Sequence, residues 1–211
     1  MTSSLPAVSL AITGASGACY GLRLLECLLQ AGCAVSVMIS TSARVVIGME
    51  TELRLPVRPD RIRELLCQHF AAQPARLRVF GRNEWTAPVA SGSSAPDAMV
   101  ICPCTMGTLS AIANGASKNL IERAADVMVK ERRRLVLVPR ETPVSAIHLE
   151  NMLRLARLGV TVLPASPGFY HRPAGIEALV DFVVARILDQ LEIEHTLLPR
   201  WGKADPLIES V

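Results

Sequence analysis

Short runs of apolar residues alternate along the chain with longer segments in which apolar residues recur every three or four positions. A short apolar run is typical of a buried strand, whereas the wider spacing is typical of an amphipathic helix. The predicted strands are residues 8–12, 34–39, 77–80, 99–102, 135–138 and 160–163. The first predicted helix begins near Ser16 or Ala18 and continues to residue 29. The others cover 41–48, 61–70, a segment after Thr105, 121–133, 145–158 and 175–191.

This alternation of strands and helices predicts an α/β fold. We expect a single doubly wound parallel sheet of the Rossmann or flavodoxin-like type, with helices on both faces. Such a sheet binds its ligand in a crevice beyond the carboxyl ends of the strands, near the point where the strand order reverses. Polar residues follow several predicted strands, and we expect these to converge on one crevice: Thr13 to Ser16, Ser40, Thr105 to Thr108, Arg140-Glu141 and Tyr170.

The first predicted strand is followed by Gly14-Ala15-Ser16-Gly17 and then by a helix. Glycines let the backbone turn sharply and approach a ligand, and the start of a helix attracts an anion, most often a phosphate. The spacing of the glycines, together with Ser40 rather than an acidic residue after the second strand, disfavours NAD. The sequence therefore predicts a phosphate site at this turn, and the alternative is a glycine-rich turn that binds nothing.

The length of 211 residues suits one domain with an ample core. Half of the residues are hydrophobic, and the mean hydropathy of +0.34 is high for a monomer. Residues 1–22 and 98–117 carry no charge, but glycines and prolines interrupt both, so neither is typical of a signal peptide or a membrane span. We therefore expect subunit interfaces to bury the excess. Residues 1–194 are predicted to form the domain, and 195–211 an arm that packs on the assembly.

Six cysteines are scattered along the chain, with no Cys-x-x-Cys pair and no neighbouring histidine that would complete a metal set. Scattered reduced thiols are typical of a cytoplasmic protein. The net charge of only +3 gives no global field that would recruit nucleic acid or an anionic membrane. These features exclude no enzyme class, but they argue against a metal site and against nucleic-acid binding.

Basic side chains suggest a second anionic subsite, formed by Arg123, Lys130, Arg140 and Arg186. Arg140 follows a strand directly, which places it at the crevice rather than on an outer helical face. The neighbouring run Arg132 to Arg134 is interpreted instead as a solvated face, because isolated surface charges need no partner.

Two aromatic residues lie in predicted loops, and each allows two interpretations. Tyr170 is either a half-buried loop aromatic or a phosphate ligand. Trp85, in the long predicted loop 81–96, either packs on a neighbour or stabilises positive charge with its indole face. The four histidines (69, 148, 171 and 195) have neither triad partners nor metal-ligand spacing, so we interpret them as structural.

Several motifs together resemble the flavin prenyltransferase (UbiX) family, within the flavin-containing cysteine decarboxylase-like flavoproteins. The resemblance spans nearly the whole chain in order. The motifs are Gly14-Ala15-Ser16-Gly17 with Tyr20-Gly21, Ser40-x-x-Ala43-Arg44, Pro103-Cys104 through Thr108-Leu109-Ser110, Arg123-Ala-Ala-Asp126-Val-x-x-Lys130-Glu131-Arg132-Arg133, Arg140-Glu141-Thr142-Pro143 and Phe169-Tyr170-His171-Arg172-Pro173.

The resemblance implies transfer of a dimethylallyl group from its monophosphate to N5 and C6 of reduced FMN, and a product used by partner decarboxylases, as in ubiquinone synthesis. It also implies a large homo-oligomer, a dodecamer with sites shared among subunits. By resemblance, Lys130, Tyr170 and Arg186 hold the donor phosphate, with Arg123 on the same helix as Lys130. FMN is held by Gly14, Ala15, Ser16, Ser40, Thr105, Met106, Gly107, Thr108 and Arg140. Ser16, Glu50 and Glu141 are candidates for proton handling.

Prenyl transfer often uses aspartate-rich motifs that hold magnesium against a diphosphate, and no Asp-Asp-x-x-Asp motif occurs here. Fixed cations and a hydroxyl are the expected substitute, because preorganised donors stabilise the charge that develops on a leaving phosphate. Two other functions stay open. One is an FMN-dependent cysteine-type decarboxylase, although we find no Pro-x-Met-Asn-type motif, and the other is a flavin carrier without chemistry.

Overall fold

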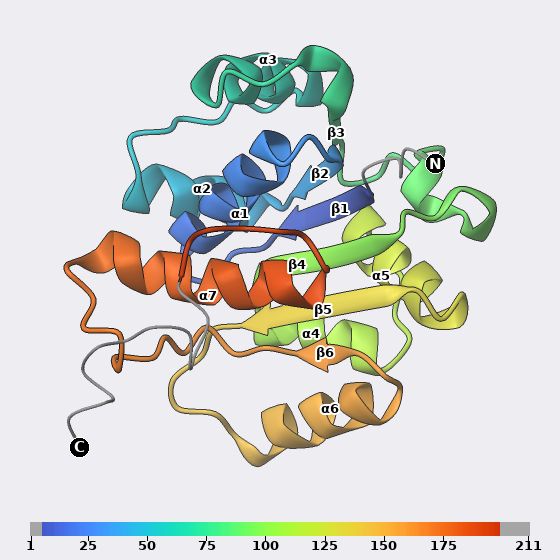
Figure 1. Ribbon diagram of the computed structural model, residues 1–211. Coiled ribbons are helices and arrows are strands. Elements are labelled where there is room, and N and C mark those ends of the chain that lie inside the picture. Colours follow the sequence, from blue (N-terminus) through green and yellow to red (C-terminus); the bar gives the residue numbers. More distant parts are fainter. Residues whose placement is uncertain (1–5, 199–211) are drawn as a thin grey trace, which may run out of the picture.

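The computed structural model describes residues 6–198, which form one six-stranded parallel sheet (Figure 1). The strand order is β3-β2-β1-β4-β5-β6, so the order reverses between β1 and β4. This is the 3-2-1-4-5-6 order of the Rossmann sheet rather than the 2-1-3-4-5 order of flavodoxin, which confirms the predicted class and fixes its type. The strands are β1 (Ala7–Ile12), β2 (Ala34–Ile39), β3 (Leu77–Phe80), β4 (Ala98–Cys104), β5 (Arg134–Pro139) and β6 (Thr161–Val162).

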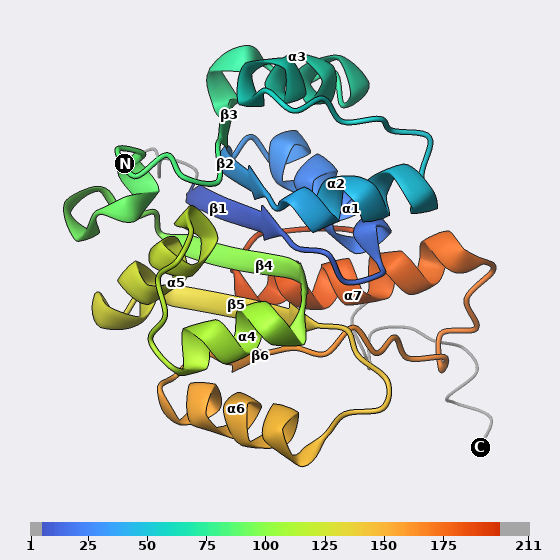
Figure 2. The same cartoon turned by 180° about the vertical axis from the view of Figure 1, so that it is seen from behind.

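Helices cover both faces of the sheet, as predicted. Helices α1 (Ala18–Gln30), α2 (Thr41–Glu50), α3 (Pro59–His69) and α7 (Ile176–Gln190) share one core cluster with the strands. Seen from behind, the other face carries α4 (Met106–Ala113), α5 (Leu120–Lys130) and α6 (Ala146–Arg157) (Figure 2). Three short 3-10 helices, η1 (Pro74–Arg76), η2 (Pro88–Ala90) and η3 (Gly92–Ser94), lie in the connections.

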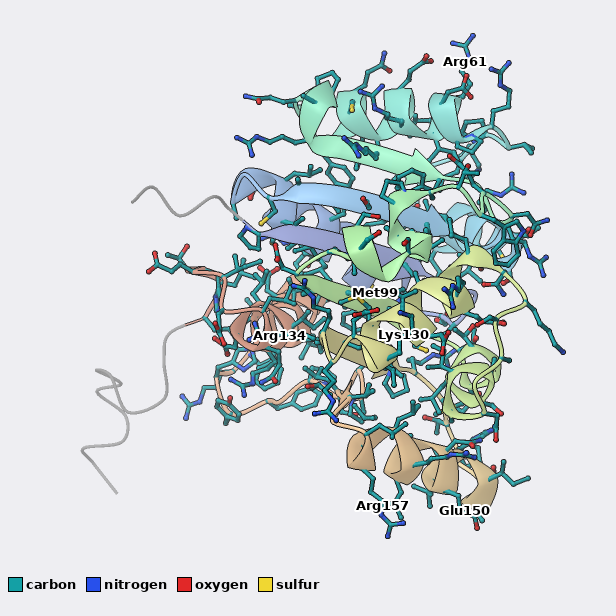
Figure 3. The ribbon with its side chains drawn as sticks, turned by 90° about the vertical axis from the view of Figure 1, so that its right-hand side faces the viewer. Arg61, Met99, Lys130, Arg134, Glu150 and Arg157 are labelled. Carbon is teal, nitrogen blue, oxygen red and sulfur yellow. The ribbon has the colours of Figure 1, made fainter. Side chains whose placement is uncertain are left out.

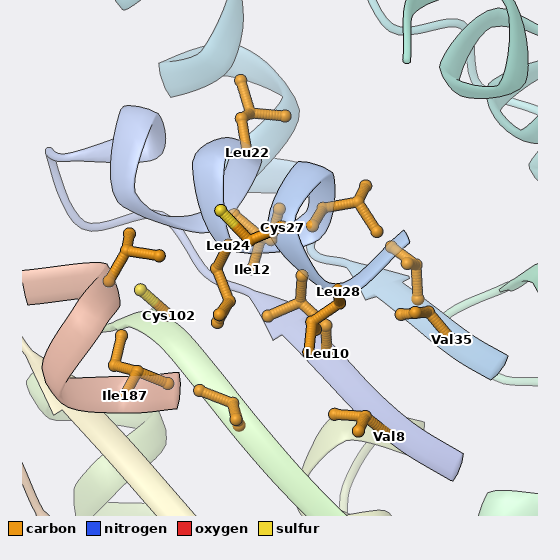
Figure 4. Packing of buried hydrophobic residues seen from close by; sticks show 14 of the residues in the cluster. Val8, Leu10, Ile12, Leu22, Leu24, Cys27, Leu28, Val35, Cys102 and Ile187 are labelled. Atoms are coloured by element: carbon orange, nitrogen blue, oxygen red, sulfur yellow. The ribbon is translucent and has the colours of Figure 1, made fainter. Parts of the chain in front are cut away.

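Alternate residues of the strands feed the two cores. On β1, Leu10 and Ile12 point into the cluster that α1 and α7 complete, while Ala11 belongs to the opposite cluster. Figure 4 shows Leu24 and Leu28 of α1 packed over this strand, with Ile187 of α7 nearby. Each such aliphatic side chain, when fully buried, contributes about 1.5–3 kcal/mol through the hydrophobic effect. The strand ends are therefore held rigidly where polar residues follow.

Strand β4 is longer than the predicted 99–102 and includes Pro103. Its pairing with β5 is regular to Ile101 and resumes at Cys104 after a shift in register. Proline cannot donate a ladder hydrogen bond, and it is tolerated inside a sheet at such an irregularity. The sequence pattern predicted that the strand ends before Pro103, whereas in the structure β4 continues through Pro103 to Cys104.

Three helix ends differ from the prediction by two or three residues. Helix α2 continues two residues beyond the predicted 48, so that Glu50 is its last residue. Helix α5 ends at Lys130 rather than at 133, and Arg132 after it adopts a left-handed φ of 53°. Helix α3 begins at Pro59, two residues before the predicted 61, so Asp60 lies in its first turn and pairs with Arg58.

Residues 81–96 were predicted as one long loop, and the segment 81–97 between β3 and β4 contains η2 and η3. It is anchored along α5, because Arg82 O accepts a hydrogen bond from Leu120 N (2.8 Å) and Ala90 O accepts one from the Arg123 guanidinium (3.1 Å). Ala87 and Val89 are buried in the core that α4 and α5 form. The segment therefore forms one unit with α5.

Exposed apolar side chains account for part of the high hydropathy. Helix α6 buries only Leu155, and its exposed apolar residues are Ile147, Leu149 and Leu153. Within residues 6–198, no helix is long and apolar enough to cross a membrane. At the start of the predicted arm, His195 lies 3.2 Å from Asp189 of the same chain, and the arm's remaining residues 199–211 lie outside the described part.

Candidate active site

The turn after β1 is closed from within the chain. Gly17 precedes α1 in a left-handed conformation (φ 101°), which glycine adopts without strain. The Glu50 carboxylate accepts hydrogen bonds from Gly17 N (2.9 Å) and Ala18 N (2.8 Å), the N–H groups that open the helix. The predicted phosphate position at the start of α1 is therefore filled by a side chain from α2. This contact depends on α2 reaching residue 50. The predicted helix ended at residue 48, so the sequence pattern did not reveal the contact.

Ser16 stands exposed at the same turn, and its backbone oxygen accepts a hydrogen bond from Arg140 Nε (3.1 Å). The predicted neighbours Ser16 and Arg140 thus meet, although they are far apart in the sequence. Glu141 follows Arg140 and is exposed at the same edge of the sheet. Ser16, Glu50, Arg140 and Glu141 all lie past the carboxyl ends of strands.

Thr13 joins the two strands on either side of the switch point. Its hydroxyl donates to Pro103 O (2.8 Å) and accepts from Thr105 N (2.8 Å), and the residue is 2% exposed. Thr105 caps α4 by accepting a hydrogen bond from Thr108 N (3.1 Å). Met106 is 7% exposed and packs in the core, so only its backbone is left to face a ligand, whereas Gly107 is exposed.

A cavity of about 460 Å³ opens beside these residues. The carboxyl ends of β2 and β3 and the starts of α2 and α5 form its wall, together with Thr108 of α4. Two predicted FMN ligands, Ser40 and Thr108, line it. The full lining is Met38, Ile39, Ser40, Thr41, Ser42, Val45, Phe80, Gly81, Arg82, Thr108, Asn119, Leu120 and Ile121.

The cavity adds polar residues that the sequence reasoning had not singled out. Ser42 Oγ lies 3.0 Å from Ser40 Oγ. Asn119 caps α5 by accepting from Glu122 N (3.0 Å), a pattern that an Asn three residues before a Glu at a helix start signals. Gly14 connects the cavity to the first turn, because a Cβ added there would lie 2.4 Å from Ser42 Oγ.

The predicted second anionic subsite is not assembled within one chain. Arg123 pairs with Asp126 (2.9 Å), and Trp85 is 49% exposed in the segment that follows β3. Lys130 pairs with Glu131 beside Gly92, just before β5 begins. Figure 3 views the edge where the strands start, and Lys130 and Arg134 are labelled on that side. Lys130 and Arg140 therefore lie at opposite ends of β5, since a helix that precedes a parallel strand delivers its last residue to the strand's amino end.

Tyr170 and Arg186 form a separate group. The His171 ring stacks on Phe182 at 5.4 Å, and the Tyr170 ring meets Phe182 edge-on at 5.7 Å. Arg186, one helical turn after Phe182, is exposed and donates to Asp189 (2.5 Å). Tyr170 contacts Phe182 of α7, and Arg186 lies one turn further along that helix; that the two act together stays a prediction.

The cysteines near the crevice are inert packing residues. Burial raises the pKa of the Cys104 thiol to about 12 and raises the pKa of Cys102 further. Burial also raises the pKa of Cys19, and the nearby Glu50 carboxylate adds to that rise. Because the thiolate is the nucleophile and the metal ligand, these thiols supply neither at neutral pH. Within residues 6–198, no three His, Cys, Asp or Glu side chains are placed so that they could hold a metal ion.

Known proteins resemble the chain over nearly its full length. The model of the Flavoprotein family matches residues 2–188. The flavin prenyltransferase UbiX of Pseudomonas aeruginosa is 60% identical over 196 residues, which is 93% of this chain and 94% of that protein. Among solved structures, AnUbiX (PadA1) in complex with FMN and dimethylallyl pyrophosphate superposes with a TM-score of 0.84 at 39% identity, covering 96% of this chain and all of that one.

A dodecameric FMN-dependent UbiX-like decarboxylase from Escherichia coli O157:H7 superposes with a TM-score of 0.81 at 38% identity, covering 93% of this chain and 99% of that one. Family, sequence and fold thus agree with the resemblance that the motifs carried. The chain belongs to the Flavoprotein family and, within it, to the UbiX flavin prenyltransferases.

Proposed function

We propose that this protein transfers a dimethylallyl group from dimethylallyl monophosphate to N5 and C6 of reduced FMN, without a divalent metal. The observation that carries the proposal is the edge of the sheet where the Ser16–Arg140 contact lies close to a cavity lined by Ser40 and Thr108. These residues match the family motifs, and a relative binds FMN and dimethylallyl pyrophosphate in its solved structure.

FMN fits this edge through its phosphate. The cavity offers the Ser40, Ser42 and Thr108 hydroxyls and the start of α2, which suit an anion, whereas Leu120 N and Glu122 N at the start of α5 are already bound. The start of α1 does not offer its N–H groups, since Glu50 holds them. We therefore place the phosphate in the cavity, and assign Gly14, Ala15, Ser16, Thr105, Met106, Gly107 and Arg140 to the rest of the flavin. When bound, reduced FMN supplies the nucleophilic N5 and C6.

The donor phosphate needs cations from more than one chain. Strand β5 has six residues, so at about 3.3 Å per residue its ends lie roughly 20 Å apart. Arg140 follows one end, and Lys130 precedes the other. A site that uses both must combine subunits, and we propose a dodecamer in which the α5 unit of one chain, with Trp85, Arg123 and Lys130, completes the crevice of another. The dodecameric relative supports this arrangement.

In that shared site the cations act on the leaving group. A phosphate gains charge as the allylic C–O bond breaks, so fixed donors stabilise the transition state more than the ground state. Lys130, Arg123, Tyr170, Arg140 and Arg186 are the proposed donors. The Trp85 indole would face the allylic cation. Ser16, Glu50 and Glu141 would take up the protons that N5 and C6 give up and return one to the alkene carbon, as ring closure requires.

The product would leave as a cofactor for a partner decarboxylase of the ubiquinone-pathway type, in the cytoplasm. The scattered free cysteines support that compartment.

Anaerobic incubation of the protein with reduced FMN and dimethylallyl monophosphate tests the proposal. Mass spectrometry should find FMN increased by one dimethylallyl unit, and excess EDTA should leave the rate unchanged. Unmodified FMN would return the protein to the carrier or decarboxylase alternatives. Activity lost to EDTA and restored by magnesium would contradict the metal-free mechanism.

A further inference from the structure

One charged side chain lines the cavity beside α2. Of the thirteen residues that form its wall, Arg82 is the single cation, and none is acidic. Alongside apolar side chains, the lining therefore offers one cation and several hydroxyls with no carboxylate to balance the charge. It suits a ligand group that carries negative charge and accepts several hydrogen bonds, as a phosphate monoester does.

Arg82 is held at the cavity by its backbone. Its carbonyl oxygen accepts a hydrogen bond from Leu120 N (2.8 Å), which ties the end of β3 to the start of α5. Its side chain is exposed and has no ion pair or hydrogen bond with any other residue of the described part. The nearest carboxylate in the sequence, Glu84, turns back and accepts from Gly81 N (2.8 Å) instead. The guanidinium is thus left available at the cavity mouth.

We propose that Arg82 binds the FMN phosphate and sets the preference of this protein for FMN over riboflavin. The inference rests on the proposed function, because it takes the cavity as the flavin phosphate site. Ser40, Ser42 and Thr108 supply neutral hydrogen bonds to a phosphate, whereas Arg82 supplies a bidentate, charge-assisted pair. Riboflavin has no phosphate, so Arg82 contributes nothing to its affinity.

Flavin fluorescence titrations of the full chain, with FMN and with riboflavin, test the assignment. Arg82→Gln should weaken FMN binding about tenfold and leave riboflavin binding unchanged, because one charge-assisted contact is lost. Arg82→Lys, which keeps the charge, should recover part of the loss. Arg78→Gln is the matched control, since Arg78 is an exposed arginine on β3, the strand before Arg82, and does not line the cavity. The FMN loss should also shrink as salt is raised.

The outcomes separate the two proposals. If the wild-type protein prefers FMN and Arg82→Gln keeps the same FMN-to-riboflavin ratio, the role of Arg82 is overturned while the proposed function stands. If Arg82→Gln weakens the binding of FMN and of riboflavin equally, the role of Arg82 is also overturned, since that result means general damage to the site. Equal wild-type affinity for FMN and riboflavin would overturn the inference together with the phosphate placement. A wild-type protein that binds neither flavin would overturn the proposed function itself.

Discussion

The turns after β1 and β2 start from similar sequence signals and end differently. Each follows a buried strand, carries small polar residues and opens a helix. The β1 turn has the glycines, yet the N–H groups at the start of α1 are bound by Glu50. The β2 turn has Ser40, Thr41 and Ser42, and it opens into the 460 Å³ cavity. A glycine-rich turn is therefore not an anion site by itself, because a side chain from another helix can fill it first.

This difference suggests separate roles for the two turns. The β1 turn is fixed from both sides, by Glu50 on its N–H groups and by Arg140 on the Ser16 oxygen, which suits a place where chemistry needs an exact geometry. At the β2 turn, the Ser40 and Ser42 hydroxyls bond to each other and line the cavity, which suits binding. The turns touch where Gly14 packs on Ser42, so a change in one is transmitted to the other.

The largest expected effect lies outside both turns. Lys130→Ala should lower the prenylation rate by about a hundredfold or more, since losing one preorganised donor to a developing charge has that effect. FMN affinity should stay the same, because both turns are intact. Single-turnover kinetics and a flavin titration measure the two quantities. Lys118→Ala is the control, as Lys118 is also an exposed lysine near α5. Full activity of Lys130→Ala would show that the donor phosphate binds elsewhere.

The contact between the turns is tested by Gly14→Ala. The new Cβ would lie 2.5 Å from Ser42 Cβ, so the start of α2 must shift. Overpacking of this kind lowers the free energy of unfolding by about 1–3 kcal/mol. Because Ser42 lines the cavity, we also expect FMN to bind about tenfold more weakly. Adding Ser42→Gly removes the clashing atoms and should restore much of the stability. Gly14→Ala with unchanged FMN affinity would mean that the two turns are not coupled.

The sheet and most helices could be predicted, because the spacing of apolar residues reports burial directly. The boundaries failed where tertiary contacts override local pattern. The chain passes through Pro103 because a register shift accommodates it, and α2 reaches Glu50, where the side chain meets α1. Neither contact leaves a periodic trace in the sequence.

The site was harder to predict than the fold. Residues directly after strands, such as Ser40, Thr105 and Arg140, follow from topology, since parallel strands end at one edge. The cavity residues Arg82 and Asn119 lie after β3 and before α5, and their meeting depends on how the segment 81–97 packs along α5. The place of Lys130 at the opposite edge follows from the path of α5, which residue types alone do not reveal.

Trp85→Leu tests the unit formed by the segment 81–97 and α5, and its expected effect on the prenylation rate is smaller. An indole face that is shielded from water stabilises a cation by about 1–2 kcal/mol, so the prenylation rate should fall by about 5–30-fold. FMN affinity should stay nearly unchanged, because Trp85 does not line the cavity. Trp85→Phe keeps an aromatic face and should retain part of the rate. An unaltered rate in Trp85→Leu would return this residue to a packing role.

The sharpest test of the comparison is Glu50→Ala, for which the smallest effects on folding and flavin binding are expected, whereas its proposed proton role would also lower the prenylation rate. Removing the carboxylate leaves the first N–H groups of α1 without their partner, which typically costs about 1 kcal/mol of the free energy of unfolding. Denaturant unfolding should detect this loss, and Glu52→Ala, a nearby exposed glutamate, should not cause it. FMN affinity should not change if the phosphate binds at the β2 turn. Tighter FMN binding would mean that the phosphate competes with Glu50 for α1, and the two turns would then exchange the roles assigned to them.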